Sequence, residues 1–188
     1  MSKKITLLIG LLLLIAIPIG ISFFSEKPKP AEKTPSIPQV VSPTEKIVNA
    51  QTSLAFFPSP YAISSSSGSL AVAIDTGENE VTAVQLEITY DPKVLQNVAI
   101  TPGTFFENPL QLLKNVNSTK GKITYAFGAA PTAKAKIGSG TVATITFTTN
   151  LKPGEKTDIT FSPETLVTAE GVRVTVLKEA LGTTIERQ

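Results

Sequence analysis

Carboxylates are the side chains best suited to chemistry in this chain of 188 residues. Asp75, Glu78 and Glu80 lie together in the segment DTGENE, and calcium is bound by several such oxygen ligands. The same segment has the threonine, glycine and asparagine typical of a chain reversal, and its spacing matches no known calcium loop. We interpret it as a solvated turn and expect neither a metal nor a cofactor, with a calcium site as the alternative.

Histidine, cysteine and tryptophan are absent from the sequence. Their absence excludes a His-based catalytic triad, a thiolate nucleophile, a disulfide and a Cys/His zinc site. Acid–base catalysis by carboxylates needs two of them converging in a cleft, whereas the acidic residues here fall in predicted turns. We therefore expect that the protein is not an enzyme.

The charge of the chain is unevenly distributed, although the net value is only +2. The first 46 residues contain six lysines and three glutamates, which leaves eleven basic and twelve acidic residues for the remainder. A nucleic-acid-binding domain normally carries a basic patch or stripe. We therefore expect no nucleic-acid partner.

An apolar run over residues 5–24 follows Lys3 and Lys4 near the N-terminus. About 20 residues make a helix of about 30 Å, which spans a bilayer. We expect residues 1–24 to form a transmembrane signal anchor. The alternative is a cleaved signal peptide, because Pro18 and the small residues Gly20 and Ser22 resemble the end of such a signal. In both cases the C-terminal part is predicted to be extracellular, either membrane-anchored or secreted.

Residues 25–46 contain five prolines among charged and small polar residues. Such a composition favours an extended polyproline II spacer, not a packed core. The segment is predicted to be a linker that holds the following domain away from the membrane.

Short segments of alternating apolar and polar residues occupy residues 47–188 and are separated by turns rich in glycine and proline. This pattern is typical of an all-β sandwich with about eight to ten strands and no helix. The predicted strands are 53–57, 70–75, 81–90, 95–100, 112–116, 122–127, 141–149, 158–161 and 172–177, with a further short piece at 183–186.

Alternation along three of these segments separates a core face from a solvated face. If the three segments pair, the solvated face is small, polar and flat, which suits a protein partner better than a buried ligand. We expect partner contacts at Ala83, Gln85, Glu87, Thr124 and Ala126, with Lys134 and Lys136 on a charged rim. The residues assigned to the core are Val84, Leu86, Ile88, Tyr90, Ile123, Tyr125, Phe127, Ala143, Ile145 and Phe147.

Three motifs in succession resemble the cohesin domain: LEITYDPKVLQNVAITPGTFF at 86–106, GKITYAFGA at 121–129 and GSGTVATITF at 138–147. The resemblance covers roughly residues 53–188. It implies a nine-stranded jelly-roll sandwich, related to carbohydrate-binding modules, that binds dockerin domains on a flat face built partly from the Tyr-Asp-Pro strand. Many cohesins carry Asn and Asp where this chain has Ala83 and Gln85.

The resemblance implies a cell-surface cohesin-like module that captures a dockerin-like protein domain, in a polysaccharide-degrading or other surface assembly. One alternative is a module that binds carbohydrate or associates with the cell wall. Sugar rings stack on exposed aromatic side chains, and Tyr61, Phe105 and Phe106 are the aromatics left for that role. A surface spacer without a ligand is the other alternative.

Overall fold

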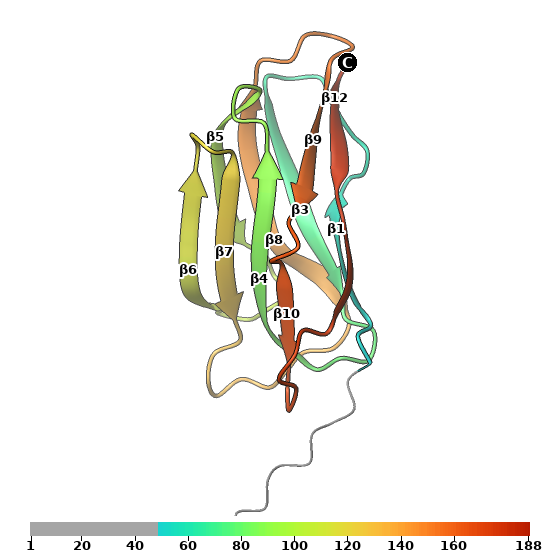
Figure 1. Ribbon diagram of the computed structural model, residues 1–188, viewed down its shortest axis with the longest axis vertical. Helices are drawn as coiled ribbons and strands as arrows, with labels where there is room; N and C mark the ends of the chain where they lie inside the picture. Colours follow the sequence, from blue (N-terminus) through green and yellow to red (C-terminus); the bar gives the residue numbers. More distant parts are fainter. Residues whose placement is uncertain (1–48) are drawn as a thin grey trace, which may run out of the picture. The chain divides into compact units, whose positions relative to one another are not determined.

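The computed structural model describes residues 49–188, which contain twelve strands in two sheets packed face to face (Figure 1). No helix occurs in this part of the chain, so the predicted all-β sandwich is confirmed. The count of nine strands is wrong, because several short strands flank the long ones. Within residues 49–188, no helix has the length and apolarity needed to cross a membrane. The predicted anchor, residues 1–24, and linker, residues 25–46, lie outside the described residues.

The smaller sheet has five strands in the order β11-β1-β3-β8-β5. Its pairs are antiparallel except β1 and β11, which run parallel. The strands are β1 (Thr52–Phe57), β3 (Ser67–Asp75), β5 (Leu95–Pro102), β8 (Ser139–Thr149) and β11 (Leu177–Leu181).

The larger sheet has seven strands in the order β2-β12-β9-β4-β7-β6, and β10 pairs with β4 beyond the end of β9. In Figure 1, β4 lies between β7 on one side and β9 and β10 on the other. The strands are β2 (Tyr61–Ile63), β4 (Val81–Tyr90), β6 (Leu110–Asn117), β7 (Lys122–Gly128), β9 (Lys156–Phe161), β10 (Leu166–Ala169) and β12 (Thr183–Arg187).

Alternate side chains of both sheets meet in one hydrophobic core, as the period of two requires. All ten side chains assigned to the core from the sequence are buried. Aromatic side chains fill much of the core: Tyr125 stacks on Phe127 with ring centroids 4.6 Å apart, and Phe56 stacks on Phe161 at 4.5 Å. This packing fixes the directions of the side chains on the outer face of the larger sheet.

The strand predicted at 172–177 is wrong. Val172 and Val176 pack on the core, but residues 172–176 form a loop and only Leu177 lies in a strand, as the first residue of β11. In the loop, the Thr175 hydroxyl accepts from the Val167 amide at 3.1 Å and donates to the Val167 carbonyl at 3.2 Å. The Thr175 side chain takes the place of part of a backbone ladder, beside a single backbone bond from the Val176 amide to the Val167 carbonyl at 2.9 Å, so the alternating valines do not form a strand. The short strands β2, β10 and β11 were not predicted, apart from Leu177 at the start of β11.

The exposed edge strand β6 carries two features that oppose pairing with another chain. Its ladder with β7 is interrupted by a bulge between Gln111 and Leu113. Lys114 lies opposite the buried Tyr125, and therefore points to the core side of the edge. Bulges and inward-pointing charges are devices by which β-proteins avoid edge-to-edge association.

Candidate binding face

The structure brings all five predicted contact residues together on the outer face of the larger sheet. Ala83, Gln85 and Glu87 lie on β4, and Thr124 and Ala126 lie on the adjacent strand β7. Gln85 is directly opposite Ala126, and Glu87 is directly opposite Thr124. Their role in binding stays a prediction, but the expected grouping is present.

The third predicted segment, which forms β8, does not join this face. It lies in the smaller sheet between β3 and β5, so its outward threonines point away on the opposite side of the molecule. Sequence alternation identifies which residues share a face of one strand, but it does not say which strands pair. The condition that all three segments pair in one surface is therefore not met.

Glu87 is enclosed, although it was expected to be solvated: only 5% of the residue is exposed. Its carboxylate accepts a hydrogen bond from the Thr124 hydroxyl at 2.8 Å, and Lys122 Nζ lies 3.0 Å away. The Gln85 amide also donates to it, at 3.4 Å. The hydrogen bond and charge of Glu87 raise the pKa of Lys122. Glu87 therefore holds its neighbours in place instead of offering a free carboxylate.

The backbone of Glu87 is held by Thr165, a buried residue in the loop between β9 and β10. The Thr165 hydroxyl accepts from the Glu87 amide at 3.1 Å and donates to the Glu87 carbonyl at 3.0 Å. The Ser162 amide also donates to that carbonyl, at 2.7 Å. These contacts hold β4 at the point where its hydrogen-bonded neighbour strand changes from β9 to β10.

Exposed leucines border one end of the face and were not predicted as site residues. Leu113 lies opposite Ala126, and Leu166 lies opposite Gln85, so Leu113, Ala126, Gln85 and Leu166 form a row across four strands. Leu110 lies in the next row. The exposed fractions of Leu110, Leu113 and Leu166 are 48%, 49% and 40%. We call these three residues the leucine border.

Local features at two strands explain why the sequence did not predict the leucine border. Leu110 precedes the predicted strand 112–116, and the bulge beside Leu113 changes which residues face outward. Leu166 follows the turn-forming Ser162 and Pro163, and nothing in the sequence showed that a short strand begins there. Because of that bulge, extending the alternation back from Val116 would place Leu110 on the core side, so the sequence carries no signal for its outward position.

A glycine keeps the face flat between the leucines. Gly128 lies between Ala83 of β4 and Leu110 of β6. A Cβ added to Gly128 would lie 2.7 Å from the Ala83 Cβ and 2.6 Å from the Thr82 carbonyl oxygen, closer than packed atoms allow. The two strands approach closely here because neither side chain extends beyond a methyl group.

The other end of the face is polar. Asn115 lies opposite Thr124, and Asn117 lies opposite Lys122. On the far side of β4, the hydroxyls of Thr89 and Thr160 are 2.9 Å apart. The outer face therefore changes along its strands from an apolar end at the leucine border to a hydrogen-bonding end around Lys122.

The acidic turn does not assemble a metal site in the structure. One carboxylate oxygen of Asp75 accepts a hydrogen bond from the Gly77 amide at 2.9 Å, as in an Asx turn, and Gly77 has a positive φ of 56°. Within residues 49–188, no three acidic, histidine or cysteine side chains converge as metal ligands would.

The aromatic side chains considered for sugar stacking are mostly enclosed. Phe105 and Phe106 are buried in the core, which contradicts their assignment as free aromatics. Tyr61 is half-buried and packs edge-on against Phe147, with centroids 6.3 Å apart. Phe57 is the exposed aromatic of the described chain, at 69%, and one ring does not make a stacking platform.

Comparison with protein families matches residues 65–186 to the cohesin domain, which is more than half of the chain. No curated protein matches the chain significantly. One similar solved structure is the third cohesin of ScaC from Acetivibrio cellulolyticus in complex with the ScaB dockerin, with a TM-score of 0.60 and 21% identity. That similarity covers 73% of this chain and 99% of the solved one.

Two further solved structures share the fold. One is a type I cohesin–dockerin complex from Clostridium thermocellum, with a TM-score of 0.59 and 16% identity over 73% of this chain and 99% of that one. The other is a non-cellulosomal cohesin from the archaeon Archaeoglobus fulgidus, with a TM-score of 0.56 and 18% identity over 74% of this chain and 92% of that one. In each comparison the match covers nearly all of the solved chain, so the likeness extends over the whole sandwich. By the family match over residues 65–186, this chain belongs to the cohesin family.

Proposed function

We propose that the chain is a binding module, not an enzyme, and that it captures a dockerin-type protein domain on the outer face of the larger sheet. The observation that carries the proposal is the family match combined with a flat face that has exposed leucines at one end. Two of the similar solved structures are named as cohesin–dockerin complexes, which supports this class of partner.

The leucine border supplies the favourable free energy of binding. Each of its three side chains is about half exposed, so covering one removes roughly half the apolar area of a leucine from water. Full burial of a leucine contributes about 1.5–3 kcal/mol, so each contributes about 1 kcal/mol on docking. A stable interface of standard size buries about 1,200–2,000 Å² in total, so the partner must also cover the polar end of the face.

The polar end supplies orientation. Glu87 fixes Lys122 and Thr124 through contacts of 3.0 and 2.8 Å, so these side chains are ordered before a partner arrives. Ordered contact groups lose less conformational entropy on binding than mobile ones. Gln85, which lies between the two ends, has amide hydrogens and a carbonyl for directional bonds to the partner.

Binding assays with outward-pointing substitutions test the proposal. Titration of residues 47–188 against a panel of dockerin domains identifies the partner by calorimetry. Gln85→Arg and Ala126→Arg each place a long charged side chain in the middle of the face and are expected to abolish binding without unfolding the domain. Thr146→Arg is the matched control, because Thr146 is exposed on β8 in the opposite sheet. A partner whose affinity falls only with Thr146→Arg contradicts the proposal.

We also propose that residues 1–24 anchor the chain in a membrane and that residues 25–46 hold the domain outside the cell. The apolar run after two lysines and the proline-rich spacer support this arrangement. Cell fractionation followed by N-terminal sequencing tests it. A soluble mature protein that begins near residue 23 contradicts the anchor and indicates secretion instead.

A further inference from the structure

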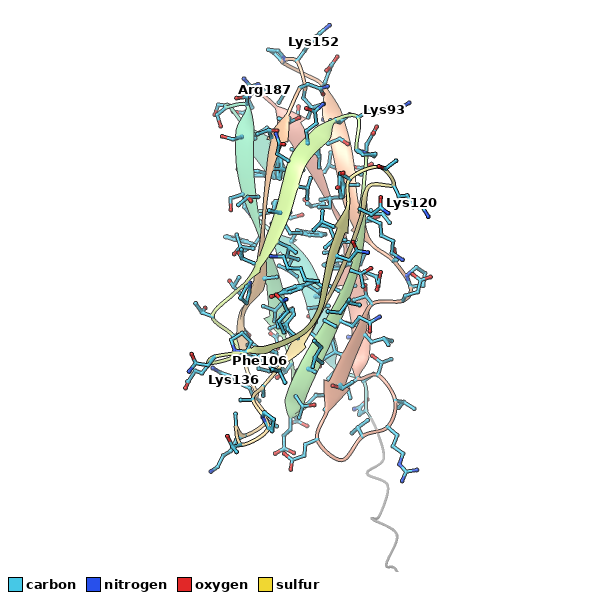
Figure 2. The ribbon with its side chains drawn as sticks, turned by 90° about the vertical axis from the view of Figure 1, so that its left-hand side faces the viewer. Lys93, Phe106, Lys120, Lys136, Lys152 and Arg187 are labelled. Carbon is cyan, nitrogen blue, oxygen red and sulfur yellow. The ribbon has the colours of Figure 1, made fainter. Side chains whose placement is uncertain are left out.

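A pocket of about 390 Å³ lies at the end of the sandwich where β7 leads into the loop before β8. Such a volume is in the range of small-molecule and side-chain sites. Figure 2 shows Phe106 and Lys136 next to each other at this end, far from Lys152 and Arg187 at the other. We call this site the lysine pocket; its lining residues are Phe106, Glu107, Ala129, Ala133, Lys134, Ala135 and Lys136.

The apolar part of the pocket rests on a packed aromatic cluster. Phe106 lies edge-on to Phe105, with centroids 4.9 Å apart, and edge-on to Phe127 at 6.1 Å. Phe127 in turn stacks on Tyr125 in the core. Since Phe106 is buried and held by these rings, this side of the pocket is formed before any ligand binds. The three alanines give the remaining wall small apolar side chains.

The charged part of the pocket has an excess of positive charge. Lys136 is held by two backbone hydrogen bonds with Val81, both 2.9 Å long, and its ammonium group lies 5.7 Å from the centre of the Phe105 ring. Lys134 is exposed at the rim. Glu107 is the one carboxylate among the lining residues. Two cations beside one anion leave the pocket suited to a negatively charged group.

One wall of the pocket adjoins the apolar end of the candidate binding face. Ala129 lines the pocket and directly follows Gly128, which lies between Ala83 and Leu110 on the face. The Ala129 amide also bonds to the Thr82 carbonyl at 2.9 Å, which fixes this wall to β4. A partner that covers Leu110, which lies opposite Gly128, is therefore next to this wall of the pocket.

We propose that the lysine pocket is a second anchor point for the docked partner, and that it takes an acidic side chain adjacent to an apolar one. The apolar side chain contacts Phe106 and the alanine wall, and the carboxylate meets the ammonium groups of Lys134 and Lys136. This inference rests on the proposed function, because its occupant is a segment of the bound partner. It adds the chemical class of that segment.

A small probe tests the chemistry of the pocket without a partner. 8-Anilinonaphthalene-1-sulfonate combines an apolar body with an anionic group and is expected to bind residues 47–188 saturably, at one site. Ala133→Trp, which fills the pocket, and the double variant Lys134→Gln with Lys136→Gln should each remove this binding. The matched control replaces two lysines at the opposite end, Lys93→Gln with Lys120→Gln (Figure 2), and should leave it unchanged. Circular dichroism confirms that each variant is folded.

Two outcomes of the probe experiment overturn the inference. One is equal binding of the probe by wild type and Ala133→Trp, which would place the probe elsewhere, for example on the leucine border. The other is equal binding of uncharged N-phenyl-1-naphthylamine and the sulfonate, which would show that the lysines contribute nothing.

The partner provides the second arm of the test. With a dockerin that binds the domain, Lys134→Glu combined with Lys136→Glu should slow association about tenfold at low ionic strength, and less at high salt. If this variant binds normally while Gln85→Arg abolishes binding, the inference fails and the proposed function stands. If Gln85→Arg also binds normally, the proposed face itself is wrong, and the inference that depends on it falls too.

Discussion

Removal of the Thr165 hydroxyl tests how the centre of the binding face is held. In Thr165→Val the side chain keeps its volume but loses both hydrogen bonds to Glu87, the accepted bond of 3.1 Å and the donated bond of 3.0 Å. The Glu87 carbonyl keeps the bond from the Ser162 amide, whereas the buried Glu87 amide loses its bond to the side chain of residue 165. The consequence of the change is therefore concentrated on one backbone N–H group.

The expected size of the effect follows from that unpaired group. Leaving a buried donor without an acceptor costs about 1–3 kcal/mol. For a domain of this length, a loss of about 2 kcal/mol lowers the thermal midpoint by roughly 6–8 °C. Thr165→Ser keeps the hydroxyl and loses only a methyl group, so its midpoint should lie between those of Thr165→Val and wild type.

Calorimetric unfolding of the two variants and hydrogen exchange of the Glu87 amide measure the effect. The amide should exchange faster in Thr165→Val than in Thr165→Ser, because only the serine still accepts its hydrogen bond. The opposite result is a Thr165→Val variant that unfolds at the wild-type temperature with unchanged exchange at Glu87. Water would then satisfy the amide and the bridge between β9 and β10 would not depend on Thr165.

Three further substitutions probe the edge, the flat face and the core. Lys114→Val removes the inward-pointing charge of β6 and should promote concentration-dependent self-association, seen as a rising mass in light scattering, whereas Lys120→Val in the adjoining turn should not. Gly128→Ala places a methyl group 2.7 Å from the Ala83 Cβ and should destabilise the domain by about 1–3 kcal/mol in denaturant titrations; an unchanged stability would mean that β4 and β7 separate easily. Burial raises the pKa of the Tyr90 phenol above its ordinary value of 10.0. The neutral phenol therefore contributes stability below pH 10, and this contribution is lost as the pH rises from there through the pKa of the folded state. Tyr90→Phe should therefore lose less stability between pH 9 and 11 than wild type does, and at neutral pH it should be no less stable, because the Tyr90 hydroxyl is buried without a hydrogen-bond partner.

The sequence was sufficient to predict the long strands and their core faces. Residues 81–90 were predicted as a strand with the bounds that β4 has in the structure, because ten alternating residues between turn signals leave little ambiguity. The outward positions of Gln85 and Ala126 followed from the same alternation. Periodicity is a local property, so it is informative wherever one face of a long strand is buried.

The order of strands in the sheets, and the burial of Glu87 by its neighbours, could not be predicted in the same way. Nothing in the local sequence of β8 shows that it joins the sheet opposite β4, because strand order depends on contacts between distant segments. Glu87 was expected to be exposed since it alternates with core residues, but Lys122, Thr124 and the loop at Thr165 enclose it. The β10 strand is four residues long, too short to give a periodic signal. The contacts that complete the site therefore come from neighbouring strands and loops that only the folded chain brings together.

Mapping the contact surface of a bound partner tests whether the partner docks on the outer face of the larger sheet. Amide chemical shifts of residues 47–188 are recorded with and without a dockerin domain that binds it. The largest changes should fall on β4 and β7 around Gln85 and Ala126 and extend to Leu113 and Leu166, with β8 and β3 nearly unaffected. Changes centred on Thr144 and Thr146 of β8, with β4 and β7 unaffected, would contradict docking on this face.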